Sequence, residues 1–430
     1  MIKLTKNIGD YMLVELTEKE FNEFSQNHES IFFQSSYWGE LKKGTGWIYY
    51  LVGYKEDNNI KAASLLLAKK IPVINKYIFY SPRGFLLDYN DFDLVKKYTD
   101  EVVKFVKSHN GIFIKINPLV IYQERDIDGN IVENGINNKK LVDYLKSLNY
   151  EHIGLTKVYG KDLEPRWISV LDLKNKTMDD IKSNYRRTTR LDVNNSYKHG
   201  LKLVEIDESR MDEFKDLMAH TGERRGFIDR PLSYYKKMYK EFSQNNNIKV
   251  MLVELDLENN LKTYEETKTN LQQKISYEKS KDRVKDNLIK ELEKQLGSAD
   301  KKISEANKLM NEKGSNIVVA GGLFMCFSNQ VVSLFGASYK EYMKYKGQYF
   351  LNNEMIKFAI ENGYEKYNFY GITGEFDESS PMFGLFDFKR GFNSNVEELI
   401  GEFTYVTNSF YNKIYKVMKK AYSLLKKVKK

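Results

Sequence analysis

The chain has 430 residues, of which 41% are hydrophobic and 14% aromatic, and its formal net charge is +9. This length suggests two or three domains, and the composition excludes wholesale disorder because it supplies enough apolar surface for buried cores. The single cysteine, Cys326, excludes a disulfide within the chain, and no stretch has the ~18 apolar residues of a spanning helix or the pattern of a signal peptide. These features predict a cytoplasmic protein.

Two pairs of segments predict an internal repeat. "VELTEKEFNEF" at 14–24 and "VEIDESRMDEF" at 204–214 each predict a strand end, a capped helix start and a helix. Residues 94–118 and 351–372 each predict an amphipathic helix, a glycine break and a strand. Two copies of one α/β unit explain both pairs, whereas chance similarity of helix-start chemistry would explain only the first.

Residues 257–313 differ sharply in composition from the segments on both sides. They lack proline, and their apolar residues follow a coiled-coil spacing. The spaced residues are Leu257, Leu261, Tyr264, Leu271 and Ile275, then Leu288, Leu292, Ala299, Ile303 and Ala306. The segment predicts two antiparallel helices with a turn near Lys281–Lys285. Its 13 basic and 11 acidic residues nearly balance, so its charge does not indicate an obvious binding surface for nucleic acid.

Residues 413–430, "KIYKVMKKAYSLLKKVKK", carry eight lysines and no acidic residue. Their apolar residues predict a helix with one apolar and one cationic face, namely Ile414, Val417, Met418, Ala421, Leu425 and Val428. Such a helix is typical of contact with an anionic membrane surface, but equally of a helix packed on its own domain. A contact with nucleic acid is a third interpretation.

Several kinds of catalytic site are absent from the sequence. The histidines are scattered and form no metal-binding motif; they are His28, His109, His152, His199 and His220. There is no nucleophile elbow and no glycine motif for a nucleotide. The nearest match to the pyrophosphate loop of acetyl-CoA enzymes is "LKKGTG" at 41–46, where Leu41 replaces the required polar residue. We therefore predict no metal and no cofactor.

An ordered set of segments combines basic, aromatic and glycine residues where strands meet loops. The segments are "FQSSYWGELKKGTGW" (33–47), "YSPRGFL" (80–86), "SNYRRTTR" (183–190), "TGERRGFIDRPLSYY" (221–235), "LFGASYKEYMKYKGQY" (334–349), "YNFYGI" (367–372) and "GLFDFKRGFN" (384–393). Together with the arm, this order resembles the Fem/MurM-type aminoacyltransferases, which build the branch peptides of peptidoglycan. The resemblance covers essentially the whole chain.

The resemblance implies a mixed α/β fold of two GNAT-like domains with an inserted antiparallel coiled-coil arm. Domain 1 then spans 1–165 and is completed by 399–412, and domain 2 spans 166–256 and 314–398. The arm occupies 257–313, and the basic helix occupies 413–430. The repeat and the missing acetyl-CoA loop, found from the residues alone, agree with this organisation.

The resemblance also implies catalytic residues. From the residues alone, a lysine among phenylalanines is typical of a strand end or an amphipathic turn whose ammonium reaches water. In the family, the Phe-Lys pair at this position is tied to transfer, which implies that Phe388 and Lys389 are catalytic. An amine that attacks an aminoacyl ester produces an oxyanion, and a fixed donor of this kind is worth ~2.7–4 kcal/mol elsewhere. Phe388 would hold the reacting groups, and no general base stands out.

The implied substrate-binding residues come from three of the quoted segments. Arg230 and Tyr234 match family positions that bind the phosphates and sugar of the acceptor, and Lys42, with Lys43 as an alternative, matches another phosphate contact. Arg83 of the "PRG" turn, with Gln34 and Trp38 of the first segment, completes the predicted set. Where relatives often carry "IDP", this chain has "INP" at 116–118, so Asn117 cannot serve as a carboxylate.

The function implied by the resemblance is transfer of an amino acid from aminoacyl-tRNA to an amine of a peptidoglycan precursor. The acceptor is lipid II or UDP-MurNAc-pentapeptide, and the cationic tail favours the lipid form, with peripheral contact at the inner face of the membrane. Two alternatives stay open. One is a GNAT acyltransferase that uses CoA, and the other is a non-catalytic coiled-coil or tRNA-binding scaffold.

Overall fold

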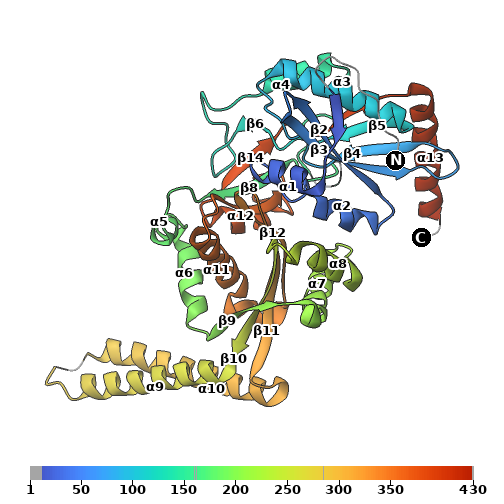
Figure 1. The fold of residues 1–430 in the computed structure, drawn as a ribbon. Helices are drawn as coiled ribbons and strands as arrows, with labels where there is room; N and C mark the ends of the chain where they lie inside the picture. The colour runs from blue at the N-terminus through green and yellow to red at the C-terminus, as the bar shows by residue number, and fades with distance from the viewer. Residues whose placement is uncertain (1–11, 159, 161, 284, 429–430) are drawn as a thin grey trace.

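The computed structural model describes residues 12–428 apart from 159, 161 and 284, and it contains two β-sheets covered by helices (Figure 1). The first sheet, in spatial order, consists of β1 (Met12–Glu15), β2 (Ile48–Glu56), β3 (Asn59–Lys70), β4 (Tyr77–Ser81), β5 (Gly111–Ile116), β15 (Phe403–Val406) and β7 (Tyr150–His152). The second consists of β6 (Ile121–Glu124), β14 (Asn395–Leu399), β8 (Trp167–Asp172), β13 (Lys366–Ile372), β12 (Gln330–Ser338), β11 (Asn316–Phe327), β10 (Ile248–Asp256) and β9 (Leu201–Ile206).

The helices belong to three groups. The first sheet is accompanied by α1 (Glu18–Gln26), α2 (Ser36–Lys43), α3 (Phe92–Ser108), α4 (Lys139–Ser147) and α13 (Ser409–Val428). The second is accompanied by α5 (Met178–Ser183), α6 (Arg187–Tyr197), α7 (Met211–Arg225), α8 (Leu232–Ser243), α11 (Gly347–Glu361) and α12 (Phe383–Arg390), with the short 3₁₀ turns Glu208–Arg210 and Lys340–Tyr345. The remaining two, α9 (Leu257–Lys279) and α10 (Asp286–Lys313), form the arm.

The two sheets contain the same α/β unit, as the repeat predicts. In the first sheet α3 connects the parallel strands β4 and β5, and in the second α11 connects the parallel strands β12 and β13. The segment at 14–24 also forms the predicted capped helix, because the Thr17 side chain accepts from the Glu20 backbone N–H and the Glu20 carboxylate accepts in return. The predicted mixed α/β class with an antiparallel helical arm is confirmed.

Two strands cross between the sheets. Phe403–Val406, near the end of the chain, pairs with β5 and β7 in the first sheet. Ile121–Glu124 lies within the range predicted for domain 1, but it pairs with β14 in the second sheet. The strand from 403–406 thus lies within 399–412, the segment expected to complete domain 1, whereas the helix and strand patterns do not indicate that 121–124 joins the second sheet.

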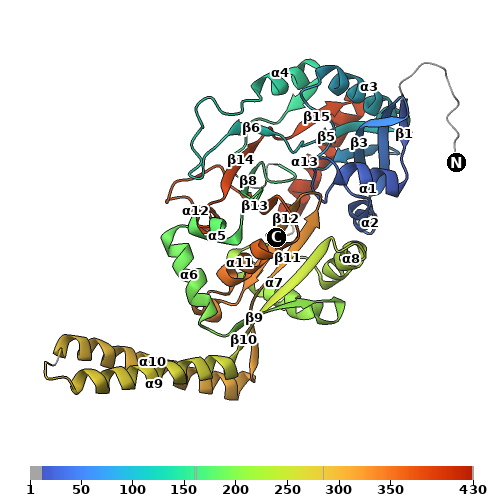
Figure 2. The same cartoon turned by 60° about the vertical axis from the view of Figure 1, so that its left-hand side comes forward.

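The arm projects away from both sheets (Figure 2). Its helices pack through Leu271 and Ile275 of α9 against Ile289, Leu292 and Ala299 of α10. The predicted position Leu288 is wrong by one residue, because Leu288 is 39% exposed and Ile289 takes the buried place. Only one face of α10 packs against α9, so the burial of Ile289 instead of Leu288 sets how α10 is rotated about its own axis.

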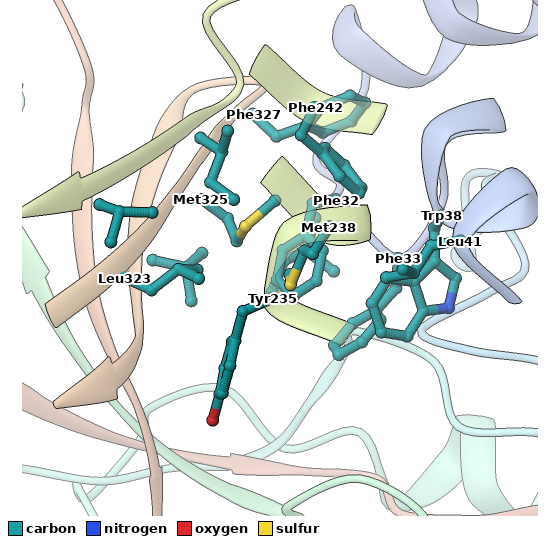
Figure 3. Packing of buried hydrophobic residues seen from close by; sticks show 14 of the residues in the cluster. Phe32, Phe33, Trp38, Leu41, Tyr235, Met238, Phe242, Leu323, Met325 and Phe327 are labelled. Carbon is teal, nitrogen blue, oxygen red and sulfur yellow. The ribbon is translucent and has the colours of Figure 1, made fainter. Parts of the chain in front are cut away.

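One apolar core joins the two halves. It combines Phe32, Phe33 and Trp38 from the first half with Tyr235 and Met238 of α8 and with residues of β11 (Figure 3). Polar contacts reinforce the junction, since Gln330 Nε2 donates to Ser30 O at 2.9 Å. Burial of a shared core of this kind favours one fixed arrangement of the halves. Side chains from the two halves therefore keep fixed positions relative to one another at this junction.

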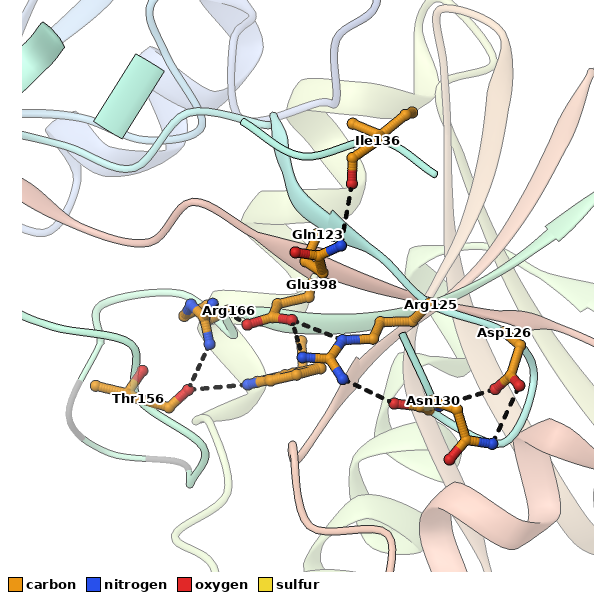
Figure 4. A network of polar contacts seen from close by, with 10 residues as sticks. Gln123, Arg125, Asp126, Asn130, Ile136, Thr156, Arg166 and Glu398 are labelled. Atoms are coloured by element: carbon orange, nitrogen blue, oxygen red, sulfur yellow. Dashed lines mark hydrogen bonds and ion pairs between the residues drawn. The ribbon is translucent and has the colours of Figure 1, made fainter. Parts of the chain in front are cut away.

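Hydrogen bonds fix the linker between β7 and β8, residues 153–166, near both of its ends. Arg166 Nη1 donates to Thr156 O at 3.0 Å, and Trp167 Nε1 donates to the same carbonyl at 2.9 Å. Arg166 also pairs with Glu398 of β14, which accepts a second hydrogen bond from Arg125 Nε at 2.7 Å (Figure 4). This buried network fixes the linker residues that precede Arg166.

The basic helix α13 packs on its own half of the molecule. Tyr411, Tyr415 and Met418 lie against a small core around Ile112 and Phe113. The predicted apolar face is therefore wrong in part, because Val417 is 69% exposed, while Leu425 and Val428 lie beyond the side chains that the structure describes. No helix in the described part of the chain has both the length and the apolar character to cross a bilayer.

Candidate functional site

The "PRG" turn lies between the two sheets and is fixed by buried polar contacts. Arg83 has a left-handed backbone with φ of 55°, and its N–H donates to Asn117 Oδ1 at 2.8 Å. The same oxygen accepts from Tyr80 Oη at 3.2 Å. Gln34 is fully buried, donates from Nε2 to Pro82 O at 2.5 Å, and accepts from the Leu65 backbone N–H at 2.8 Å.

These contacts give Gln34 and Asn117 a structural role in shaping the turn. Both atoms of the Gln34 amide are taken by backbone partners, which leaves Gln34 no free reach for a ligand, whereas Asn117 uses only its Oδ1. With "INP" in place of "IDP", the Asn117 oxygen still makes both of the contacts described. The predicted substrate contact of Gln34 gains no support from this arrangement.

Arg83 extends from this turn to the linker. Its Nη2 donates to Pro165 O at 2.7 Å, which places the buried guanidinium beside Glu164. Among the described residues, neither Arg83 Nε nor Asn117 Nδ2 has a hydrogen-bond partner. Buried donors without acceptors are costly, so this turn offers unsatisfied N–H groups to an anion or a polar ligand.

Glu164 is the centre on which the predicted substrate-binding residues converge. Its Oε2 accepts from Tyr370 Oη at 2.5 Å, and its carboxylate lies within electrostatic reach of three cations, Arg83, Lys42 and Arg230. Burial raises the pKa of Glu164, and these neighbours oppose that rise. One carboxylate cannot neutralise three cations, so the cluster retains an excess of positive charge.

Lys42 contributes from the last turn of α2. Its Nζ lies 4.7 Å from the centre of the Trp38 ring, a cation–π distance, and Trp38 is itself buried. Burial lowers the pKa of Lys42, the charge of Glu164 opposes this, and the charges of Arg230 and Lys69 add to it. The Trp38 ring therefore stabilises the Lys42 ammonium through a cation–π contact.

The neighbouring Lys43 does not join the cluster. It is exposed and pairs with Glu40 on the same helix at 3.3 Å. Of the two lysines left as alternatives by the sequence, the structure brings Lys42 to the cluster.

Arg230 and Tyr234 contribute from the loop before α8 and from its first turn. The guanidinium carbon of Arg230 lies 5.6 Å from the centre of the Tyr234 ring, and Arg230 is exposed. Burial raises the pKa of Tyr234 to about 12, so its hydroxyl stays protonated at neutral pH. The adjacent Asp229 is occupied, since it pairs with Lys215 and accepts from Tyr235 Oη at 2.6 Å. Arg230 is thus left available to an anionic ligand.

Tyr370 links the cluster to Lys389, and it does so through an irregular backbone. Its φ is 64°, a conformation rare for an aromatic residue, and the pairing of β13 with β8 shifts between Asn368 and Tyr370. The Tyr370 N–H donates to Asn368 Oδ1 at 2.8 Å, which stabilises the bulge. The bulge turns the Tyr370 phenol toward Glu164 while its carbonyl accepts from Lys389 Nζ at 3.3 Å.

Lys389 lies in α12, a helix, and not in the strand end or turn that the residues alone indicated. Its side chain is buried, with the residue 7% exposed, and its Nζ donates to Gly371 O at 2.7 Å as well as to Tyr370 O. Burial lowers the pKa of Lys389 to about 7. An ammonium has three N–H donors, so a protonated Lys389 keeps one for a reacting group.

Polar contacts fix the position of α12. Asp387 pairs with Arg186 at 2.8 Å and with Arg390 at 2.7 Å, and Arg390 also pairs with Asp128 at 2.7 Å. These contacts tie α12 to the start of α6 and to the turn after β6 that contains Asp128. Phe388 packs instead into the core of the second half.

The aromatic ring of Phe388 lies 5.0 Å from that of Tyr349 and 5.4 Å from that of Phe392. These contacts orient the helix. They do not support the expectation that Phe388 holds the reacting groups.

Other kinds of site are not formed by the described residues. Within that part of the chain, no three histidine, cysteine or carboxylate side chains gather as they would around a metal ion. Burial raises the pKa of the Cys326 thiol to about 12, so this cysteine is not a thiolate nucleophile. The arrangement that remains is a set of cations beside a buried lysine.

Comparison with known proteins agrees with this arrangement. The sequence model of the FemAB family matches residues 16–420. The chain belongs to the FemAB family. The resemblance found in the sequence is thereby confirmed, and the protein is an aminoacyltransferase.

Two relatives in the FemAB family come from Staphylococcus epidermidis. Aminoacyltransferase FemB of strain ATCC 12228 is 32% identical over 419 residues, covering 96% of this chain and 99% of the relative. Aminoacyltransferase FemA of strain ATCC 35984 is 33% identical over 416 residues, covering 94% of this chain and 98% of the relative. Among solved structures, the crystal structure of FemX matches with a TM-score of 0.76 and 25% identity, covering 94% of this chain and 99% of that one.

Sequence reasoning missed two residues of the candidate site. Glu164 stands in "GKDLEPRW", a loop segment without a motif, so nothing in the sequence marks it. Tyr370 stands in a quoted segment, but its role depends on a bulge that the alternation of residues does not reveal.

Proposed function

We propose that this FemAB aminoacyltransferase moves an amino acid from aminoacyl-tRNA to an amine of a peptidoglycan precursor and so builds the interpeptide bridge. The observation that carries the proposal is the convergence of Lys42, Arg83 and Arg230 on one carboxylate, joined through Tyr370 to the buried Lys389. These residues come from both halves of the chain, so the site exists only when the halves are docked.

The cationic cluster suits the diphosphate of the acceptor. Arg230 can form two parallel hydrogen bonds to phosphate oxygens, while Lys42 acts as a point charge. The excess of positive charge over Glu164 favours a dianionic group, and the unpaired N–H groups of Arg83 and Asn117 supply further donors. Both lipid II and UDP-MurNAc-pentapeptide carry such a diphosphate, and we favour the lipid-linked form.

The chemical step balances without a cofactor. The neutral acceptor amine attacks the ester carbonyl carbon of the aminoacyl-tRNA, and a C–N bond forms as the carbonyl oxygen becomes an oxyanion. The third N–H of the Lys389 ammonium donates to that oxyanion. When the intermediate collapses, the C–O bond to the terminal ribose breaks, and the proton from the amine passes through water to the leaving ribose oxygen.

The position of Lys389 fits this role. Its two carbonyl partners hold Nζ in place before the reaction, so little reorganisation is needed as charge develops. With a pKa of about 7, a large fraction of Lys389 is charged at neutral pH, and its proton is more acidic than that of an ordinary lysine.

A transfer assay tests the proposal. The purified protein is incubated with a pool of radiolabelled aminoacyl-tRNAs and with either lipid-linked or nucleotide-linked muropeptide, beside a Lys389→Ala control. Label that reaches the muropeptide and is lost in the control identifies the reaction, the donor and the acceptor together. Absence of transfer from every donor to either acceptor would contradict the proposal, and acetyl transfer from acetyl-CoA would replace it with the CoA-dependent alternative.

A further inference from the structure

The hairpin between β3 and β4 presents an apolar residue that the fold itself does not use. Val73 is 96% exposed and has a φ of 76° in the turn that follows Pro72. Left-handed backbone favours glycine or asparagine and is costly for a β-branched residue. Neither packing nor backbone preference accounts for valine at this position, which suggests that its side chain meets something outside the chain.

The hairpin and α13 form one surface although they are far apart in the sequence. Ile71, Ile74 and Ile78 of the hairpin belong to the same small cluster as Tyr415 and Met418 of α13. Lys76 Nζ also lies 4.8 Å from the centre of the Tyr411 ring. Figure 1 shows the hairpin beside α13 at the edge of the molecule, away from the arm.

This surface is basic throughout. Residues 69–76 and 409–430 contain eleven lysines and no acidic residue. Removal of these eleven charges from the formal net charge of +9 leaves −2 for the rest of the chain. Lys413, Lys416 and Lys419 are exposed along α13, and apolar side chains stand among them, with Val417 69% and Phe410 67% exposed.

We propose that residues 69–76 and α13 form a surface that docks on an anionic lipid bilayer, with Val73 inserted at the boundary of headgroups and acyl chains. Lysines beside exposed apolar side chains are typical of surfaces that lie in this boundary. Nucleic acid would use the charge but would gain nothing from a fully exposed valine at the hairpin tip.

The surface also continues toward the cationic cluster. Lys69, at the start of the hairpin, is close enough to Lys42 for its charge to lower the pKa of that lysine. An acceptor whose diphosphate is carried on a membrane lipid would therefore meet the positive charge of Lys69 near the site. This last step rests on the proposed function, whereas the docking itself does not.

Vesicle cosedimentation tests the docking without any transfer reaction. The full chain is mixed with phosphatidylcholine vesicles, with or without phosphatidylglycerol. We expect binding only to the anionic vesicles, weakened by salt. Val73→Asn suits the left-handed backbone, so it preserves the turn, and it should weaken binding by about tenfold. Ile131→Asn, at another exposed apolar position that lies outside residues 69–76 and α13, is the matched control and should leave binding unchanged.

A second variant tests the charge. Replacement of Lys413, Lys416 and Lys419 by glutamine should weaken binding to anionic vesicles by about 100-fold. The proposal is overturned if the protein ignores phosphatidylglycerol, or if Val73→Asn binds like the wild type. It is also overturned if tRNA displaces the vesicles and the lysine variant loses tRNA while Val73→Asn retains it, since the surface would then bind nucleic acid. Because the readout is sedimentation, loss of docking and loss of transfer are distinguishable.

Discussion

Two lysines of the site differ in their surroundings, since Lys42 is half-buried and Lys389 is buried, and burial lowers the pKa of both. Lys42 has an aromatic ring beneath it and Glu164 nearby, and the carboxylate opposes the effect of burial on its pKa. Among the residues that the structure describes, Lys389 donates to two backbone carbonyls, and burial lowers its pKa to about 7. The difference shows how one fold provides both a cation for binding and a buried lysine with a lowered pKa.

This contrast also separates the two roles by position. The cations around Glu164 come from loops and helix ends that can meet a large ligand, and Arg230 is exposed. Lys389 is enclosed by α12 and the end of β13. Binding and chemistry should therefore respond differently to substitution.

The largest effect is expected for Lys389→Met, which keeps the length of the side chain and removes its donors. We expect kcat for transfer to fall by about 100- to 1,000-fold with a much smaller change in KM, because the lost contact is made to the oxyanion. Steady-state kinetics with saturating acceptor measure this change. Equal effects on KM and kcat would mean that Lys389 binds substrate instead, and a matching melting temperature would show that the variant is folded.

The same variant should change how stability depends on pH. The folded-state pKa of Lys389, about 7, lies below its unfolded value near 10.4, so the unfolded chain binds more protons between these values. The wild type should therefore gain stability over Lys389→Met by about 1.4 kcal/mol per pH unit above pH 7, and the difference should be flat below it. Urea unfolding at several pH values measures this difference. A difference that is flat from pH 6 to 9 would show that Lys389 is not buried as described.

The binding side of the comparison is tested by Arg230→Met and Lys42→Met. Each should raise KM for a diphosphate-bearing acceptor by about 10- to 100-fold with little change in kcat, since each loses a charge-assisted contact. Lys43→Met is the matched control, because Lys43 is exposed and pairs with Glu40 on the helix surface, and less than about a twofold change is expected. If Lys43→Met had the larger effect, the assignment of Lys42 to the cluster would be wrong.

The smallest effect is expected for Glu164→Gln. The amide keeps an acceptor for Tyr370 but removes the negative charge that partly neutralises the cluster. Inorganic pyrophosphate should bind about 3- to 10-fold more tightly to this variant, as isothermal titration calorimetry can measure. Weaker binding would mean that the carboxylate holds the cations in place and that its loss disorders them.

Sequence reasoning found much of this arrangement and missed its centre. The repeat predicted the shared α/β unit because helix, glycine and strand patterns are local and appear twice. The resemblance to the Fem/MurM-type enzymes implied Lys42, Arg83, Arg230 and Tyr234, and the structure brings them together. The predicted set also included Gln34, which is buried in support of the turn.

The missed features depend on contacts between distant residues. No sequence motif marks Glu164, because its role depends on cations that are distant in the sequence. The rotation of α10 was off by one residue because Leu288 and Ile289 are both apolar, and only packing against α9 selects between them. The pKa of Lys389 likewise follows from its burial and not from its neighbours in sequence.

The most direct test of the central claim is the pH dependence of single-turnover transfer by the wild type divided by that of Lys389→Met. This ratio cancels the titration of the acceptor amine, which both proteins share. If the Lys389 ammonium donates to the oxyanion, the ratio should be constant below pH 7 and fall about tenfold per pH unit above it. A ratio that rises up to pH 7 and then levels would contradict the account, because the neutral amine of Lys389 would then be the active form.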